Sequence, residues 1–308
     1  MCNPENMEGN RPPNPHDERP LVKDLLEKHK ASIEDVRQRI KSDETVGKPL
    51  WDPERYDDIW ILRYILSHKG DKNSAAKAAL KTMKIRDEMN MNELGDIRHR
   101  IKNYGVENED TIESLPGFDL YNKYACKNGI IISQPDPDRG VLVFLDISDW
   151  DFDGMMAGMS NEQVKEHSLY LNEAVYQILD EVTRRTGKLT KLTRILDLGT
   201  FSFFKINYKF SRRDAAIQKQ IEDYHPQLLE KIYIFNPPSW FNAVWQVMRP
   251  FFPKRFAEKL DVAYSSKLHT PLLKQVSEAN LPERLGGKNK EWPLPSIAVT
   301  MATAAANE

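Results

Sequence analysis

Three apolar runs, each followed by a segment with helical periodicity, constrain the fold of this chain more than any other feature. The runs cover residues 140–147, 192–198 and 231–235 and are rich in branched aliphatic side chains. Near-continuous apolar runs are typical of strands that are covered on both faces of a parallel sheet. Their alternation with helices predicts an α/β domain with a largely parallel sheet.

The ends of the intervening helices are also marked in the sequence. Ser160 and Gln163 form the Ser-x-x-Gln pattern of a capping box, and Gly187 stands where that helix should end. A second helix is expected over residues 212–224, before the break at His225-Pro226.

The amino-terminal part carries only helical patterns. We expect helices over residues 21–40, 57–67 and 73–89, the last capped by Asn73-Ser74, and a shorter helix near 93–102.

These patterns predict a small all-helical domain over residues 19–110, followed by an α/β domain over 111–289. Residues 1–18 are rich in proline and asparagine, and 290–308 end in an Ala/Thr tail. We expect both ends of the chain to be flexible.

A strongly aromatic helix is expected after the last apolar run. Prolines 237 and 238 stop the strand, and Ser239 is predicted to cap a helix that reaches Phe252. Two neighbouring rows of apolar side chains follow at helical spacing, with Trp240, Phe241, Val244, Trp245, Val247, Met248, Phe251 and Phe252 as their members. Such a helix buries two faces, or buries one and offers the other to an apolar partner.

Basic residues gather at the far end of this helix. Arg249, Lys254 and Arg255 stand beside the aromatic rows, and aromatic residues next to basic ones suit a membrane interface. An ordinary core helix would show the same apolar rows. Spacing alone leaves both interpretations open.

Short motifs occur in a fixed order along the chain. They are Asp-Asp-Ile-Trp-Ile-Leu-Arg-Tyr-Ile-Leu from residue 57, Tyr-x-Pro from 224, Lys-Ile-Tyr-Ile-x-Asn-x-Pro from 231, Phe-x-x-Val-Trp from 241, Arg-Pro-Phe-Phe from 249 and Asn-Leu-Pro-Glu-x-Leu-Gly-Gly from 280. In this order they resemble the CRAL-TRIO lipid-binding family, over roughly residues 50–288. That family includes the yeast-type phosphatidylinositol/phosphatidylcholine transfer proteins and the tocopherol and retinal carriers.

The resemblance implies a hydrophobic pocket beneath the sheet, closed by a mobile helix. By position, that gate is the helix over residues 240–252 with the segment 253–259 behind it. The implied function is non-catalytic binding of a hydrophobic ligand and its exchange between membranes. A lipid-regulated adaptor that binds a small GTPase or a kinase is the alternative.

The resemblance also implies where a polar headgroup would lie. Members that bind phosphatidylinositol carry basic residues whose equivalents here are His68 and Lys259, whereas Gln227, Leu228 and Phe256 replace other headgroup contacts. We therefore expect weak or absent selectivity for phosphatidylinositol. Another phospholipid, a sterol or an isoprenoid remains an open choice of ligand.

Thr200 and Ser202 follow the second apolar run, at the carboxyl end of a strand, where open α/β sheets bind ligands. We count both hydroxyls as ligand-binding candidates. Ser202 would act as a nucleophile only beside a base, for which His167 and His225 are conceivable. The sequence contains no nucleotide-binding or nucleophile-elbow motif. We expect no enzymatic activity, and a lipid-modifying enzyme is the less favoured alternative.

Composition limits the remaining classes. A formal net charge of −2 provides no overall attraction for nucleic acid. Cys2 and Cys126 stand far apart without metal-ligand spacing, so neither a metal site, a cofactor nor a disulfide is expected. The sequence has no signal-peptide core, membrane span or lipidation motif. It predicts a cytoplasmic protein that contacts membranes peripherally and transiently.

Overall fold

The computed structural model describes residues 17–92, 116–125, 130–133, 136, 139–199, 201–252, 254–262, 269–273 and 276–291. The predicted helix near 93–102 and the outer parts of both tails lie outside these residues. The boundaries proposed for the two domains therefore remain predictions.

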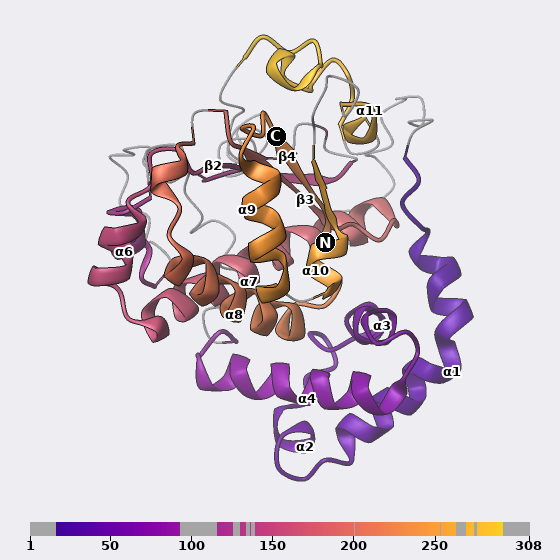
Figure 1. The fold of residues 1–308 in the computed structure, drawn as a ribbon. Coiled ribbons are helices and arrows are strands. Elements are labelled where there is room, and N and C mark those ends of the chain that lie inside the picture. Colours follow the sequence, from indigo (N-terminus) through magenta and orange to yellow (C-terminus); the bar gives the residue numbers. More distant parts are fainter. Residues whose placement is uncertain are drawn as a thin grey trace, which may run out of the picture.

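The described residues of the amino-terminal part form four helices (Figure 1), namely α1 (Val22–Lys41), α2 (Gly47–Leu50), α3 (Asp58–Ser67) and α4 (Lys72–Glu88). Asp57 caps α3 by accepting a hydrogen bond from the Trp60 amide at 3.0 Å. The predicted Asn73-Ser74 cap of α4 is wrong. Asp71 is the N-cap, because its carboxylate accepts hydrogen bonds from the amides of both residues.

The α/β part contains a five-stranded sheet in the order β1-β2-β3-β4-β5. The strands are β1 (Ile130–Ser133), β2 (Val141–Asp146), β3 (Leu192–Asp197), β4 (Leu229–Phe235) and β5 (Leu260–Val262). Only β1 runs antiparallel to its neighbour. The predicted mostly parallel α/β fold, preceded by a helical part, is confirmed. The short edge strands β1 and β5 were not predicted.

The two faces of the sheet meet different parts of the chain. Successive side chains of a strand point to opposite faces. Leu142, Ile195 and Tyr233 pack against the carboxyl-terminal segment, with Leu272 and Leu281. That segment contains α11 (His269–Leu272) and η6 (Glu283–Leu285). In Figure 1 it lies above the strands, whereas the long helices lie below them.

The helices between the strands follow the expected order. They are α5 (Phe118–Asn122), α6 (Phe152–Gly158), α7 (Asn161–Thr186), η3 (Phe203–Lys205) and α8 (Tyr208–Tyr224). Both hydrogen bonds of the Ser160 capping box are present, and Gly187 ends α7 with φ 64°. Helix α8 begins before the predicted residue 212, because the Asn207 side chain caps it by accepting from the Phe210 amide at 2.8 Å.

The aromatic segment after β4 folds into α9 (Phe241–Met248) and η4 (Arg249–Phe251). Helix α10 (Lys254–Glu258) follows, and residue 253 is not among the described residues. The predicted Ser239 cap is wrong, because Trp240 is the N-cap and offers no side-chain hydrogen bond. The Phe241 amide instead bonds to the Pro238 carbonyl at 2.9 Å, within the turn that leads into the helix.

The helical part is joined to the α/β part through a buried ionic cluster. We call Arg86, Glu173 and His225 the Glu173 cluster. The Arg86 Nη1 lies 2.5 Å from Glu173 Oε1, and the His225 Nε2 lies 3.1 Å from Glu173 Oε2. The three residues come from α4, from α7 and from the end of α8. The cluster therefore ties elements of both parts together.

Candidate functional site

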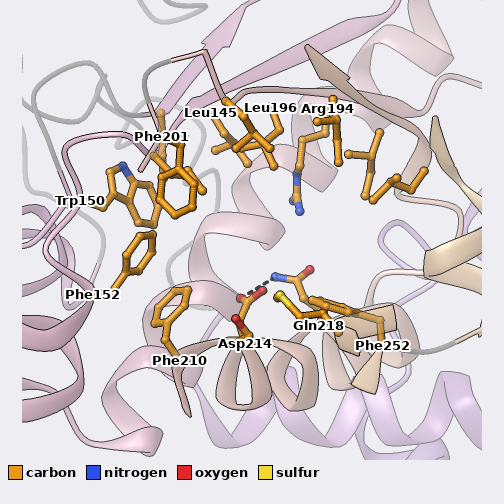
Figure 2. A pocket seen from close by; sticks show the side chains of 18 of the residues that line it. Leu145, Trp150, Phe152, Arg194, Leu196, Phe201, Phe210, Asp214, Gln218 and Phe252 are labelled. Atoms are coloured by element: carbon orange, nitrogen blue, oxygen red, sulfur yellow. Dashed lines mark hydrogen bonds between the residues drawn. The ribbon is translucent and has the colours of Figure 1, made fainter. Parts of the chain in front are cut away.

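A cavity of about 290 Å³ lies between the sheet and α8. Figure 2 shows the strands on one side of it and α8 on the other. Most of its lining is aliphatic or aromatic, and examples are Val143, Leu145, Ile147, Trp150, Phe152, Leu196, Phe210, Ile232 and Ile234. The strand residues among them occupy the sheet face opposite the carboxyl-terminal segment. Concave sites with such apolar walls bind hydrophobic ligands, and this one is at the small end of their usual volumes.

Helix α9 closes one side of the cavity. Phe241 and Val244 are buried, and Trp245, Met248 and Phe252 complete this part of the lining. Trp240 also lines the cavity, just before the helix.

The opposite side of the same segment is exposed. Val247 keeps 57% of its surface and Phe251 keeps 38%. Of the two arrangements that the spacing left open, the structure therefore has the second. One face lines the cavity, and the other offers apolar side chains to the surroundings.

More exposed aromatic residues surround the start of α9. Phe204 is 95% exposed and Phe203 is 48% exposed, and both belong to η3. The Phe203 ring centroid lies 5.7 Å from that of Trp240. The sequence interpretation did not include these two phenylalanines. A signal was present, since adjacent phenylalanines in a loop between a strand and a helix are seldom needed for the core.

Basic residues accompany this exposed surface. Arg249 and Lys254 are exposed, and the Arg212 guanidinium lies 4.8 Å from the centroid of the Phe251 ring. The side chain of Arg255 lies outside the described residues.

A narrow extension of about 50 Å³ shares Asn172, Leu192, Arg194 and Gln218 with the main cavity. Several residues that the family pattern assigned to a headgroup meet here. Gln227, Leu228 and Lys259 all line the extension. The Lys259 ammonium donates a hydrogen bond to the Leu229 carbonyl at 2.5 Å.

Other predicted ligand contacts are placed elsewhere. His68 ends α3 and lines neither space, although its neighbour Ser67 lines the extension. Thr200 and the side chain of Phe256 lie outside the described residues. Ser202 caps η3 through the Phe204 amide at 3.4 Å and does not line the cavity, whereas Phe201 does.

The histidines considered as bases are not near Ser202. His225 belongs to the Glu173 cluster. His167 is buried on α7, where its Nδ1 lies 3.1 Å from the Pro116 carbonyl oxygen and burial lowers its pKa to about 4. Within the described part of the chain, Ser202 therefore has no histidine partner. Those same residues contain no group of three or more potential metal ligands.

The sequence interpretation missed the polar residues that line the cavity, among them Arg194, Asp214 and Gln218. Arg194 projects from β3 toward the cavity, and Asp214 and Gln218 project from α8 on the opposite wall (Figure 2). Gln218 Nε2 donates to Asp214 Oδ1 at 3.3 Å. Burial raises the pKa of Asp214 and lowers the pKa of Arg194, because each loses water around its charged form.

A signal for Arg194 was present in the sequence. Charged residues are rarely found inside apolar strands unless they are paired or functional. Asp214 and Gln218 carried a weaker signal, since polar residues on a helix ordinarily face solvent.

Similarity to known proteins agrees with this arrangement. The family model described as the CRAL/TRIO domain matches residues 127–287. A CRAL-TRIO domain-containing protein of Saccharomyces cerevisiae is 27% identical over 241 residues, which are 76% of this chain and 72% of the relative. The Sec14 cytosolic factor of Schizosaccharomyces pombe is 23% identical over 238 residues, or 76% of each protein.

The fold is also similar to a solved structure. The crystal structure of Sfh5 superposes with a TM-score of 0.52 at 12% identity, over 93% of this chain and 98% of Sfh5. None of the described helices is long and apolar enough to cross a membrane. The cavity, the mostly parallel sheet and the match to residues 127–287 lead to one conclusion. The chain belongs to the CRAL/TRIO domain family.

Proposed function

We propose that this protein binds a hydrophobic ligand in the cavity and exchanges it between membranes without chemical conversion. The observation that carries the proposal is the two-sided α9 segment, which lines the cavity with Phe241 and Val244 and exposes Val247 and Phe251. Membership of the CRAL/TRIO domain family supports it.

A carrier is needed because lipids leave bilayers slowly. Each buried methylene is worth about 0.8 kcal/mol, so roughly thirty methylenes hold a two-chain lipid with on the order of 20 kcal/mol. A protein that opens an apolar cavity at the bilayer surface offsets that cost. Displacement of α9 and η4 would bring the cavity lining into contact with the bilayer while the ligand passes.

The membrane would be met by what we call the docking face, formed by Phe203, Phe204, Val247 and Phe251. Their apolar side chains suit the acyl boundary, and Arg249 and Lys254 lie close by in the chain to meet lipid phosphates. Each basic residue near an anionic surface contributes about 1 kcal/mol, so contact is local and reversible. The name of the fission-yeast relative, a cytosolic factor, supports a cytosolic location between contacts.

Selectivity for phosphatidylinositol should be weak. Leu228 and Gln227 line the narrow extension where the family pattern has other polar contacts, and the Lys259 ammonium already donates to a backbone carbonyl. A headgroup with several acceptors needs more donors than this extension offers.

The test is lipid transfer between vesicles by a Phe204→Asp/Val247→Asp variant. We expect transfer to slow by about tenfold or more, because carboxylates oppose entry into the interface, while the amount of lipid bound stays unchanged. Leu21→Asp is the matched control, since Leu21 is also exposed, at 40%, but precedes α1. A folded double variant that transfers lipid as fast as the control would contradict the docking face, and a wild-type protein that binds no lipid would contradict the function.

A further inference from the structure

We propose that Arg194, Asp214 and Gln218 form an anchor inside the cavity that selects an uncharged lipid alcohol by holding its hydroxyl group. This inference rests on the proposed function and adds the class of ligand. Arg194 and Gln218 lie where the main cavity meets the narrow extension that Lys259 lines, and Asp214 lines the main cavity alone.

Arg194 is the first part of the anchor. It is in the middle of β3, on the same face as the cavity residues Leu192 and Leu196. Within the described chain its guanidinium has no hydrogen bond or ion pair, and its Nε is buried without a partner. A guanidinium carries five N–H donors and no acceptor. The described residues provide no hydrogen-bond acceptor for this guanidinium, so a bound ligand would have to provide one.

Asp214 is the second part. Its carboxylate accepts a hydrogen bond from Gln218 at 3.3 Å and faces Arg194 across the cavity (Figure 2). Burial raises the pKa of Asp214 and lowers the pKa of Arg194, and the attraction between the two opposite charges offsets this only in part, since they make no ion pair. The space between them is therefore bordered by donors on one wall and acceptors on the other.

Another cation that lines the cavity is already engaged. The Lys205 ammonium donates to the Ser148 carbonyl and lies 3.9 Å from the Asp149 carboxylate. It is held toward the loop after β2, so that among the described residues that line the cavity Arg194 is the cation that faces it.

The chemistry of the two walls selects the ligand. A hydroxyl both accepts and donates, so it can receive a hydrogen bond from Arg194 and give one to Asp214. A carboxylate or a phosphate would also accept from Arg194, but it would place a second negative charge next to Asp214. An alkane would leave both polar walls without a partner. Because Arg194 offers donors and Asp214 offers acceptors on facing walls, the best ligand is polar and uncharged.

The experiment compares three probes of equal chain length: hexadecanol, hexadecanoic acid and hexadecane. Each competes with a fluorescent lipid for the full-length protein at pH 7. We expect the wild type to bind the alcohol about tenfold or more tightly than the acid and the alkane, as expected for hydrogen bonds to charged groups. Arg194→Met should lose this preference, so that the alcohol binds no better than the alkane.

Asp214→Asn should increase the affinity for the acid, a result that a misfolded variant would not give. It removes the negative charge but preserves shape, so Arg194 becomes free to pair with an anion. We expect the order to invert, with the acid binding about tenfold or more tightly than the alcohol. Asp223→Asn, on the same helix as Asp214 but in the exposed Lys81–Asp223 ion pair, is the control and should leave the order of the three probes unchanged.

The outcomes separate the two proposals. A wild-type preference for the acid, or an order of probes that is the same in all variants, would overturn the anchor while leaving lipid exchange intact. Tighter binding of phospholipids that responds to Lys259→Met but not to Arg194→Met would overturn it as well, since the polar end would then lie in the extension. Failure of the wild type to bind the fluorescent lipid or any probe would instead contradict the proposed function.

Discussion

Arg86 and Arg194 both lie inside the protein, but only Arg86 meets a carboxylate. In the Glu173 cluster, Glu173 contacts Arg86 and His225 and also accepts from Gln177 at 3.1 Å. The paired charges lower the pKa of Glu173, although burial opposes them, so it stays ionised. In the cavity, Arg194 and Asp214 face each other without bonding.

The difference separates two uses of buried charge. A closed network such as the Glu173 cluster satisfies its own members and fixes the elements that carry them. An open pair leaves donors and acceptors directed into a space, at a cost to the unliganded fold. The closed network is expected to stabilise the protein, and the open pair is expected to bind a ligand.

Of the substitutions that test this comparison, Glu173→Gln should have the largest effect on the free energy of unfolding. It leaves the Arg86 guanidinium in the interior without its counter-charge, so the free energy of unfolding should fall by about 3–5 kcal/mol. Urea denaturation measures it. Asp223→Asn is the control, because it breaks the exposed Lys81–Asp223 ion pair between α4 and α8 and should cost under about 1 kcal/mol. Equal losses in the two variants would mean that the cluster is no more important than a surface bridge.

His167 provides a buried group that is neutral, and its effect depends on pH. Its pKa falls from 6.5 to about 4 in the folded state. Its stabilising contribution is therefore complete above pH 6.5 and is lost as the pH falls toward 4, where the unfolded chain binds the proton more readily. The loss amounts to about 3 kcal/mol.

This prediction is tested by measuring the free energy of unfolding at several pH values, which gives the slope of stability against pH. His167→Gln should flatten it between pH 6.5 and 4, whereas His29→Gln on α1 should not. An unchanged slope in His167→Gln would assign the acid sensitivity to other groups.

The smallest expected effect concerns the open pair. Replacing both members, as Arg194→Met/Asp214→Leu, should leave the unliganded protein equally stable or raise its free energy of unfolding by on the order of 1–2 kcal/mol, since well-packed apolar residues replace desolvated charges. Urea denaturation of delipidated protein measures it, with Leu196→Met as the control. A clear loss of stability would place the pair with the Glu173 cluster, as part of the structural core.

Much of the fold followed from local patterns. Strands β2 and β4 were evident from their apolar runs, and the Ser160 capping box located the start of α7. Strands β1 and β5 have four and three residues, too few for a pattern to stand out. The cap of α4 was misplaced because Asp71, Asn73 and Ser74 are all good cap residues, and only geometry shows which side chain accepts.

The part of the site that lies on a single continuous segment could be predicted from the sequence. The helical spacing of the apolar residues along α9 is enough to indicate two apolar faces. The anchor was not predictable in the same way, because Arg194 and Asp214 are on different elements, and their relation depends on which face of β3 looks toward α8.

Helix α8 has a consequence for where the folded unit ends. It lines the cavity with Asp214 and Gln218, and beside them it buries Ile217 and Ile221 in the same core as the amino-terminal helices. A fragment restricted to residues 127–287, the stretch that the family model matches, would lack Arg86 and the helices that cover those isoleucines. The floor of the ligand cavity would then also be an exposed apolar surface. The boundary of the family is therefore not the boundary of the unit that can hold a ligand.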